Sequence, residues 1–200
     1  MWEGWIIFVV GAHGSGKTSV SCELQRRLRI LLNPLCVKVS LIEVSDVVRD
    51  WQLLEGRVDS EAIYTTEIVS AKLHEFLWDR LKLFRREVVI CCGAREKHLL
   101  KPPSCAIVRI ASIALTCSFE MRRQRFFIRE QDNLLNGQAE LEKNKDIKKR
   151  WDRSEIRETE LNLGDVMSNC DSSFSTTALS VSQIVDWLLS NLLVNLWRSI

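Results

Sequence analysis

Apolar runs and helical patterns alternate along the first half of the chain. Residues 5–10 are apolar without interruption and have the β-branched bias that is typical of a buried strand. Residues 19–28, which follow a glycine-rich stretch, have the pattern of a helix. Further down the chain, strands are predicted at 36–44, 87–92 and 106–111, and helices are predicted from Ser45 to Gly56 and over 60–86.

The second half of the chain is more polar, but it keeps the alternation. Residues 119–130 predict a helix, and the highly charged residues 133–157 predict a helical excursion that lies over the site and outside the core. A short fifth strand is predicted within 169–175. Apolar residues then recur at helical spacing over 178–196, which predicts a C-terminal helix.

Strands that alternate with helices indicate a parallel sheet whose strands are joined by right-handed helical crossovers. We therefore expect an α/β fold, with a three-layer αβα sandwich around a mostly parallel five-stranded sheet. Ligands of such sheets bind at the carboxyl ends of the strands. The residues that directly follow strands are therefore the first candidates for a functional site.

The stretch between the first strand and the first helix fits the phosphate-loop pattern G-x-x-x-x-G-K-[ST]. Glycines let successive N–H groups converge on one anion, and the following helix adds N–H groups and the positive end of its dipole. Lys17 can then reach the β- and γ-phosphates, and the Thr18 hydroxyl can bind Mg²⁺. His13 fills a variable position, which favours a loop residue over a catalytic base. The predicted nucleotide-binding residues are Gly11, Ala12, His13, Gly14, Ser15, Gly16, Lys17 and Thr18.

Charged residues also follow the ends of two other predicted strands. Asp46 and Arg49 come after the second strand and share a helix face, and Arg95 comes after the third strand. Asp46 and Arg49 taken alone would be explained by a helix cap and a surface ion pair. The convergence of these stretches and the phosphate loop on one rim of the sheet favours a role in binding.

A basic stripe lies on the helix that is predicted after the fourth strand. Arg122, Arg125 and Arg129 fall on one face of that helix. A stripe of this kind is commonly a solvated surface. Because this stripe starts at the rim that carries the phosphate loop, a solvated face and a phosphate clamp are equally supported.

The composition argues against several classes of protein. The net charge is +2, from 28 basic and 26 acidic residues, so the chain lacks the large excess of positive charge that favours bulk binding of nucleic acid. The seven cysteines are scattered without C-x-x-C spacing, which argues against a zinc site and favours a reducing, cytoplasmic compartment. We see no signal peptide, and polar residues interrupt the apolar C-terminal tract, so no membrane association is expected.

Together these residues resemble the nucleoside monophosphate kinase group of P-loop kinases, which includes dephospho-coenzyme A kinases. Residues 11–18 look like the family's phosphate loop, residues 45–49 are similar to its S-x-G-D-x-x-R stretch, and residues 92–95 are similar to its D-G-x-R stretch. The basic stripe is similar to the family's lid arginines. The resemblance covers nearly the whole chain, and the phosphate loop is its specific motif.

The resemblance implies a single P-loop kinase domain over residues 1–200. Its core would comprise 5–118 and 165–200, its acceptor-binding helices about 45–86, and its helical lid about 119–160. ATP and Mg²⁺ are the implied cofactors. The implied catalytic residues are Lys17, Asp46, Arg125 and Arg129, and the implied acceptor-binding residues are Asp46, Arg49 and Arg95.

Two positions depart from the family pattern. Cys92 stands where the family has an aspartate that helps to hold Mg²⁺ through water. Residues 175–177, Ser-Thr-Thr, replace an asparagine-rich turn near the adenine. The first departure bears on catalysis, and the second bears on adenine specificity.

The predicted function is transfer of the γ-phosphate of MgATP to a nucleoside monophosphate or a similar phosphorylated small molecule, such as dephospho-coenzyme A, by a monomer or homodimer. Two alternatives stay open. One is a P-loop ATPase or nucleotide-dependent switch that acts through a protein partner. The other is a catalytically impaired relative of the kinases. The sequence has no motif that distinguishes between the possible acceptors.

Overall fold

The computed structural model describes residues 4–54, 72–77, 79, 86–94, 108–133, 140–160 and 162–197. Its elements are β1 (Gly4–Gly11), α1 (Lys17–Leu32), a short 3₁₀ helix η1 (Asn33–Leu35), β2 (Lys38–Glu43), α2 (Val44–Leu54), β3 (Glu87–Cys92), β4 (Val108–Thr116), α4 (Phe119–Asn133), α5 (Glu140–Glu160), α6 (Leu163–Ser168), β5 (Ser172–Ser175) and α7 (Val181–Trp197). Residues 72–77 are also helical.

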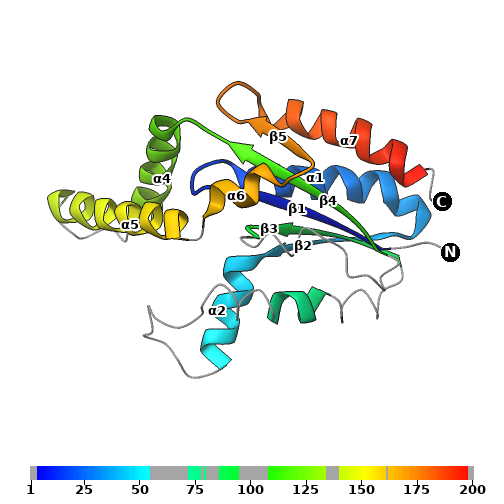
Figure 1. Ribbon diagram of the computed structural model, residues 1–200, viewed down its shortest axis with the longest axis horizontal. Coiled ribbons are helices and arrows are strands. Elements are labelled where there is room, and N and C mark those ends of the chain that lie inside the picture. Colours follow the sequence, from blue (N-terminus) through cyan, green and yellow to red (C-terminus); the bar gives the residue numbers. More distant parts are fainter. Residues whose placement is uncertain are drawn as a thin grey trace.

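The strands form one five-stranded sheet in the order β2-β3-β1-β4-β5, and every pairing in it is parallel. Helices cover both faces of the sheet (Figure 1), with α1 and α7 on one side and α2, residues 72–77 and α6 on the other. The predicted three-layer αβα fold is therefore confirmed. The alternation of strands and helices along the chain explains these layers, because a crossover, usually a helix, must connect each strand to the next parallel strand.

The central strand β1 is buried along its whole length, and its side chains alternate between the two faces. Ile7 and Val9 pack in the cluster that includes α1 and α7. Ile6 and Phe8 pack in the cluster that includes residues 72–77 and α6. A strand buried on both faces reads as a continuous apolar run, which is the pattern that predicted it.

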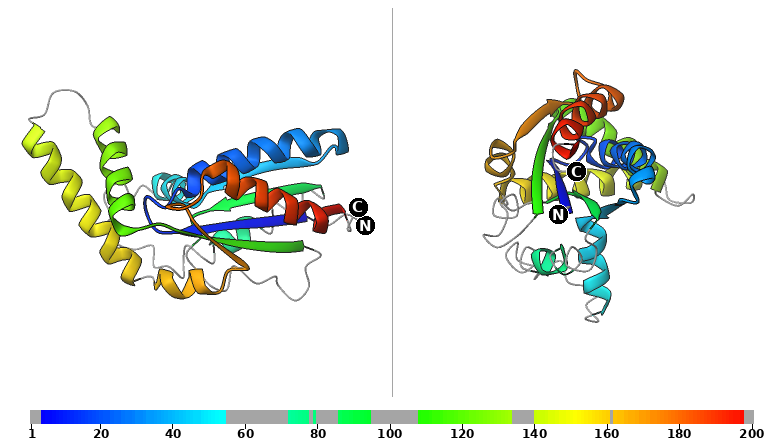
Figure 2. Two further views of the ribbon diagram at one scale, coloured as in Figure 1. Left: turned by 90° about the horizontal axis from the view of Figure 1, so that it is seen from above. Right: turned by 90° about the vertical axis from the view of Figure 1, so that its right-hand side faces the viewer.

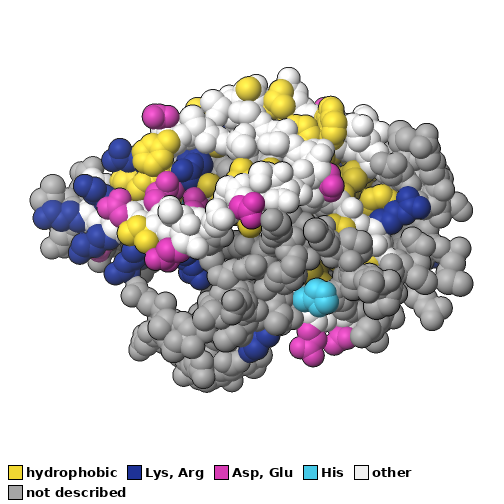
Figure 3. All heavy atoms as spheres, viewed as in Figure 1, with side chains coloured by type: hydrophobic (Ala, Val, Ile, Leu, Met, Phe, Trp, Pro, Cys, Tyr) yellow, Lys and Arg dark blue, Asp and Glu magenta, His cyan; other side chains and the backbone are white. Residues whose placement is uncertain are grey.

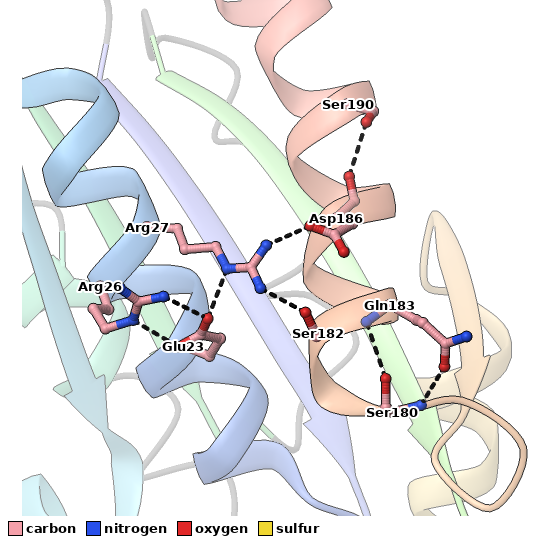
Figure 4. Close-up of polar contacts among 8 residues, drawn as sticks. All are labelled: Glu23, Arg26, Arg27, Ser180, Ser182, Gln183, Asp186 and Ser190. Carbon is pink, nitrogen blue, oxygen red and sulfur yellow. Dashed lines mark hydrogen bonds and ion pairs between the residues drawn. The ribbon is translucent and has the colours of Figure 1, made fainter.

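Polar contacts join α1 to α7 at the surface (Figure 4). The Nε of Arg27 donates to Glu23 at 2.6 Å, its Nη2 donates to Ser182 at 2.7 Å, and it also pairs with Asp186. Hydrogen bonds from Arg26, and then from Arg27, lower the pKa of Glu23 to about 2. Exposed ion pairs add little to stability, so the apolar side chains beneath them hold α7 in place.

The helices α4 and α5, here called the lid helices, extend past the end of the sheet (Figure 2). They have a small apolar cluster of their own, in which Phe126 packs with Ile147 and Trp151. Residues 140–157 of the charged segment are thus helical and lie outside the main core, as predicted, whereas residues 134–139 lie outside the described residues. Its few apolar residues fix how the two lid helices pack.

The fourth strand runs farther than predicted. The apolar run suggested an end at residue 111, but β4 continues to Thr116. The polar Ser112 is buried within it, and its N–H and hydroxyl both donate to the Asp171 carboxylate at 2.7 Å. Hydrogen bonds to Asp171 therefore allow a polar residue inside the strand. Residues 106–107 and most of the helix predicted over 60–86 lie outside the described residues.

Among the residues that the structure describes, no helix is long and apolar enough to cross a membrane.

Replacing Leu28 with alanine should destabilise the fold strongly. Leu28 lies on α1, is fully buried and packs in the cluster shared with α7. A cavity of this kind costs about 2–5 kcal/mol, which urea unfolding followed by circular dichroism would measure. The matched control is Ile30→Ala on the same helix, where the side chain is 63% exposed and a loss under about 0.5 kcal/mol is expected. Equal losses for the two variants would contradict the packing described.

Candidate functional site

The phosphate loop connects the carboxyl end of β1 to the start of α1. Gly14 has φ 73° and Gly16, the N-cap of α1, has φ 87°, which is a conformation that favours glycine. At Gly14 a second constraint applies, since a Cβ there would lie 2.5 Å from the carbonyl oxygen of Arg122. The loop and lid helix α4 are therefore in backbone contact, and Gly14 cannot carry a side chain without moving one of them.

Contacts within the loop fix its curvature. The Nζ of Lys17 donates to the carbonyl oxygen of Ala12 at 2.7 Å, and the N–H of Ser15 donates to the same oxygen at 3.2 Å. Ser15 is fully buried, whereas Thr18 is exposed at the start of α1. Lys17 is thus folded over the loop, where a phosphate oxygen can compete for its ammonium group, and the Thr18 hydroxyl is accessible to a metal ion.

The turn after β5 and the lid helix α4 meet at the loop. The Thr176 hydroxyl donates to the carbonyl oxygen of Ser15 at 3.0 Å. Arg125 donates from Nη1 to that hydroxyl and from Nη2 to the Thr176 carbonyl oxygen, both at 3.0 Å, and more weakly to the Gly14 carbonyl oxygen at 3.4 Å. Arg125 therefore reaches the phosphate loop, whereas the spacing of the arginines alone left its direction open.

Lid helix α5 brings carboxylates to the same place, which the sequence analysis did not predict. Arg122 makes a bidentate pair with Glu155 at 2.9 and 3.0 Å and contacts Glu158 at 3.2 Å. Glu158 also accepts a hydrogen bond from the backbone N–H of His13 in the loop. Glu155 and Glu158 are one helical turn apart, so their spacing opposite an arginine stripe was the available signal.

Burial raises the pKa of Glu158, and the His13 N–H and the charge of Arg122 act against that shift. The mouth of the phosphate loop therefore holds a partly buried carboxylate between cationic groups. Charged side chains of both signs gather over α4 and α5 on the face seen in Figure 3. A bound polyphosphate would meet this carboxylate as a like charge.

The structure describes the other predicted site residues only in part. Arg129 is more than half exposed, pairs with Glu130 at 3.2 Å, and so differs from Arg125 on the same stripe. Asp46 is exposed in the first turn of α2, directly after the end of β2. Arg49 lies on the same helix, but its side chain and the whole of Arg95 lie outside what the structure describes.

The end of β3 carries a neutral thiol beside the loop. Cys92 is buried, and it is in register with Val9 of β1 and with Glu43 of β2. Burial, and then the charge of Glu43, raise the pKa of Cys92 to about 12, while Ser21 and Lys17 act against the shift. Cys92 therefore stays protonated at neutral pH and lacks the charge of the aspartate that the resembling kinases have there.

The described residues contain no group of three or more His, Cys, Asp or Glu side chains that could hold a metal ion. Mg²⁺ commonly keeps several waters and binds through one or two protein groups plus substrate phosphates. The accessible Thr18 hydroxyl at the phosphate loop is such a group.

A phosphate loop at the central strand of a five-stranded parallel sheet, with helices over the loop, defines the P-loop kinase class of fold. The family model described as "AAA domain" matches residues 7–146, and the chain belongs to this family. A comparison with curated protein sequences gave no match.

Solved structures with the same fold include small-molecule kinases. The APS kinase of Mycobacterium tuberculosis, in complex with AMPPNP and APS, is 9% identical over 100% of both chains, with a TM-score of 0.54. The shikimate kinase of Bacteroides thetaiotaomicron is 16% identical over 94% of this chain and 97% of its own, with a TM-score of 0.53. The tunicamycin resistance protein of Deinococcus radiodurans is 12% identical over 94% of this chain and 95% of its own, with a TM-score of 0.55. The predicted resemblance to P-loop kinases is therefore confirmed at the level of the fold.

Replacing Glu158 with glutamine should strengthen ATP binding. A like charge at a partly buried site costs on the order of 1 kcal/mol, which corresponds to about fivefold in Kd. The difference between wild type and Glu158→Gln should shrink as the pH falls, because protonation also neutralises Glu158. Its raised pKa places this change above the ordinary value of 4.5. Titration calorimetry at several pH values would measure both effects.

The matched control is Glu160→Gln, which removes an exposed carboxylate from the same end of α5. This control should leave the Kd for ATP within about twofold of wild type, because exposed charges are screened. Unchanged or weaker ATP binding by Glu158→Gln would show that this carboxylate does not oppose the nucleotide.

Proposed function

We propose that this chain is an ATP-dependent small-molecule kinase. It would transfer the γ-phosphate of MgATP to a nucleoside monophosphate or to a similar phosphorylated small molecule, such as dephospho-coenzyme A. The observation that carries this proposal is the phosphate loop held against α4, with Arg125 bonded to the loop and to the turn after β5. The kinases that share the fold support it, and one of them was solved with AMPPNP and APS.

The donor nucleotide would be held by residues 11–18. Backbone N–H groups at the start of α1 and the helix dipole favour phosphate there, and Lys17 would leave the Ala12 carbonyl oxygen to contact the β- and γ-phosphates. Thr18 would hold Mg²⁺, which supplies neutralisation of phosphate charge when it is bound. Phosphoryl transfer depends on positioning and charge neutralisation, and these residues provide both.

The acceptor would lie at the rim after β2 and β3. In this proposal Arg49 and Arg95 bind its phosphate, because a guanidinium pairs with phosphate in a bidentate way. The role of Asp46, which is exposed in the first turn of α2, would depend on the acceptor. Asp46 would accept the proton of an acceptor hydroxyl, whereas an acceptor that is already a phosphate needs no strong base.

The lid helices would close over the reacting groups. Arg125 already contacts the loop, and Arg129 lies one turn further along α4. Closure would bring both arginines onto the transferring phosphate and exclude water, which limits hydrolysis of ATP. We further propose a cytoplasmic monomer or homodimer with no nucleic-acid or membrane partner.

One observation favours a second function, a P-loop ATPase or nucleotide-dependent switch that acts through a protein partner. The buried Cys92 provides no charge where the resembling kinases have an aspartate. If no other carboxylate takes over that task, transfer to a small acceptor would be slow. A catalytically impaired kinase would then bind ATP without turnover.

Release of ADP should depend on both an acceptor and Lys17. A coupled assay with MgATP and a panel of nucleoside monophosphates and dephospho-coenzyme A should show release with one acceptor class. Lys17→Ala should lower that rate by about 10²–10³-fold, because it removes a charge that stabilises the transferring phosphate. Acceptor-independent release that a protein partner stimulates would favour the ATPase instead, and ATP binding without release would indicate an impaired kinase.

Replacing Arg49 with alanine should impair acceptor use and leave ATP binding intact. Loss of a charge-assisted hydrogen bond to phosphate costs about 1.5–3 kcal/mol, so the KM for the acceptor should rise about 10- to 100-fold. Arg95→Ala should behave in the same way. The control is Arg26→Ala, which removes an exposed arginine on α1 that pairs with Glu23. Equal weakening of ATP and acceptor binding would refute the acceptor assignment.

A further inference from the structure

A carboxylate lies next to the neutral thiol at the end of β3. Glu43 is the last residue of β2, and it is in register with Cys92. Cys92 in turn is in register with Val9 of β1, two residues before the phosphate loop begins. Adjacent parallel strands lie about 4.8 Å apart. Glu43 therefore lies at the same rim of the sheet as the phosphate loop, and the strand that carries Cys92 lies between them.

The environment of Glu43 is unusual for a carboxylate. Its Oε1 atom is buried and has no hydrogen-bond partner among the described residues. A buried charged oxygen without a partner is costly, and native proteins rarely keep one without a reason. The carboxylate of Glu43 also makes a side-chain hydrogen bond with the Cys92 thiol, and the charges of Glu43 and Lys17 both act on that thiol, so the carboxylate and the loop lysine share one neighbourhood.

The chemistry of this oxygen fits a hard cation. Mg²⁺ prefers oxygen ligands, keeps several waters, and is held by one or two carboxylates together with substrate phosphates. At this rim the protein offers the accessible Thr18 hydroxyl at the start of α1 and the Glu43 carboxylate at the end of β2. Asp46 is a weaker candidate for the same task, because no buried oxygen without a partner is found on it among the described residues, whereas Glu43 has one.

We propose that Glu43 is the residue that positions the Mg²⁺ of the bound nucleotide, through metal-bound water, and so takes over the task of the missing aspartate at the end of β3. This inference rests on the proposed function and deepens it. In this arrangement the carboxylate lies at the end of β2 and not at the end of the neighbouring strand β3, but at the same rim of the sheet. Cys92 then fills the remaining space as a small neutral group.

The test measures how much Mg²⁺ strengthens ATP binding, a quantity that does not depend on turnover. The Kd for ATP is measured by titration calorimetry in EDTA and in excess Mg²⁺, for wild type and for Glu43→Gln. Wild type should bind ATP about tenfold or more tightly with Mg²⁺. Glu43→Gln should lose most of this ratio and bind ATP in EDTA at least as well as wild type, since a like charge has been removed.

A second variant guards against a trivial loss. In the double variant Glu43→Gln with Cys92→Asp, a carboxylate returns to the rim on the neighbouring strand, and the Mg²⁺ ratio should recover. The matched control is Asp50→Asn, which removes an exposed carboxylate from α2, the helix that follows Glu43. This control should keep the wild-type ratio in full.

The melting temperature without nucleotide gives a further readout. If Glu43 is kept for a ligand, Glu43→Gln should melt at or above the wild-type temperature, because it loses the charge on a buried oxygen that has no hydrogen-bond partner. A fall in melting temperature would instead assign Glu43 a structural role and overturn the proposal.

The outcomes distinguish a failure of the kinase proposal from a failure of the assignment of Glu43. If wild type binds ATP equally well with and without Mg²⁺, the proposed MgATP kinase and this inference both fail. If wild type shows the Mg²⁺ ratio and Glu43→Gln retains it, the kinase proposal stands and the assignment of Glu43 is wrong.

Discussion

The contact between the phosphate loop and lid helix α4 constrains the rest of the site. Gly14 lies directly under the backbone of Arg122, so the two segments approach as closely as a missing side chain permits. Arg125, one turn further along α4, then bonds to the loop and to Thr176. Because Thr176 also bonds to Ser15, segments that are far apart in the sequence form one cradle. The direction in which the lid helices leave the sheet follows from this contact.

The charges around that cradle are balanced within the chain. Arg122 is paired by two carboxylates from α5, and one of these, Glu158, also accepts from the loop N–H of His13. A cation-rich site would repel itself if it were left uncompensated, and the lid supplies anions that a polyphosphate can replace. The lid helices therefore balance the charges beside the phosphate loop with groups of the chain itself.

The fold could be predicted from the sequence because its signals are local. The apolar run at β1 and the spacing of glycines around Lys17 depend on neighbouring residues alone. The extension of β4 could not be predicted, because Ser112 reads as a strand end until its partner Asp171, 59 residues away, is known. Local patterns predict elements well, whereas hydrogen bonds between distant residues are visible only in the structure.

The candidate site shows the same division. Residues 11–18 were identified as a motif, but the spacing of the arginines on α4 could not show which of them contacts the phosphate loop. Arg125 contacts the loop, whereas Arg129 pairs with Glu130, and this difference depends on how α4 lies against the phosphate loop. Glu158 was missed because its one-turn spacing from Glu155 does not stand out among the many charged residues of α5. Arg95 remains a prediction, since it lies outside the described residues.

The proposed role of Glu43 would place a carboxylate at the rim although its neighbour Cys92 has none. In a parallel sheet the strands end at one rim, so residues in register on adjacent strands occupy neighbouring places there. Two carboxylates at these places would repel each other, and one of them would be protonated or displaced. A neutral residue at position 92 is therefore the expected companion of a carboxylate at position 43. The apparent defect at Cys92 and the orphaned oxygen of Glu43 are then two consequences of one arrangement.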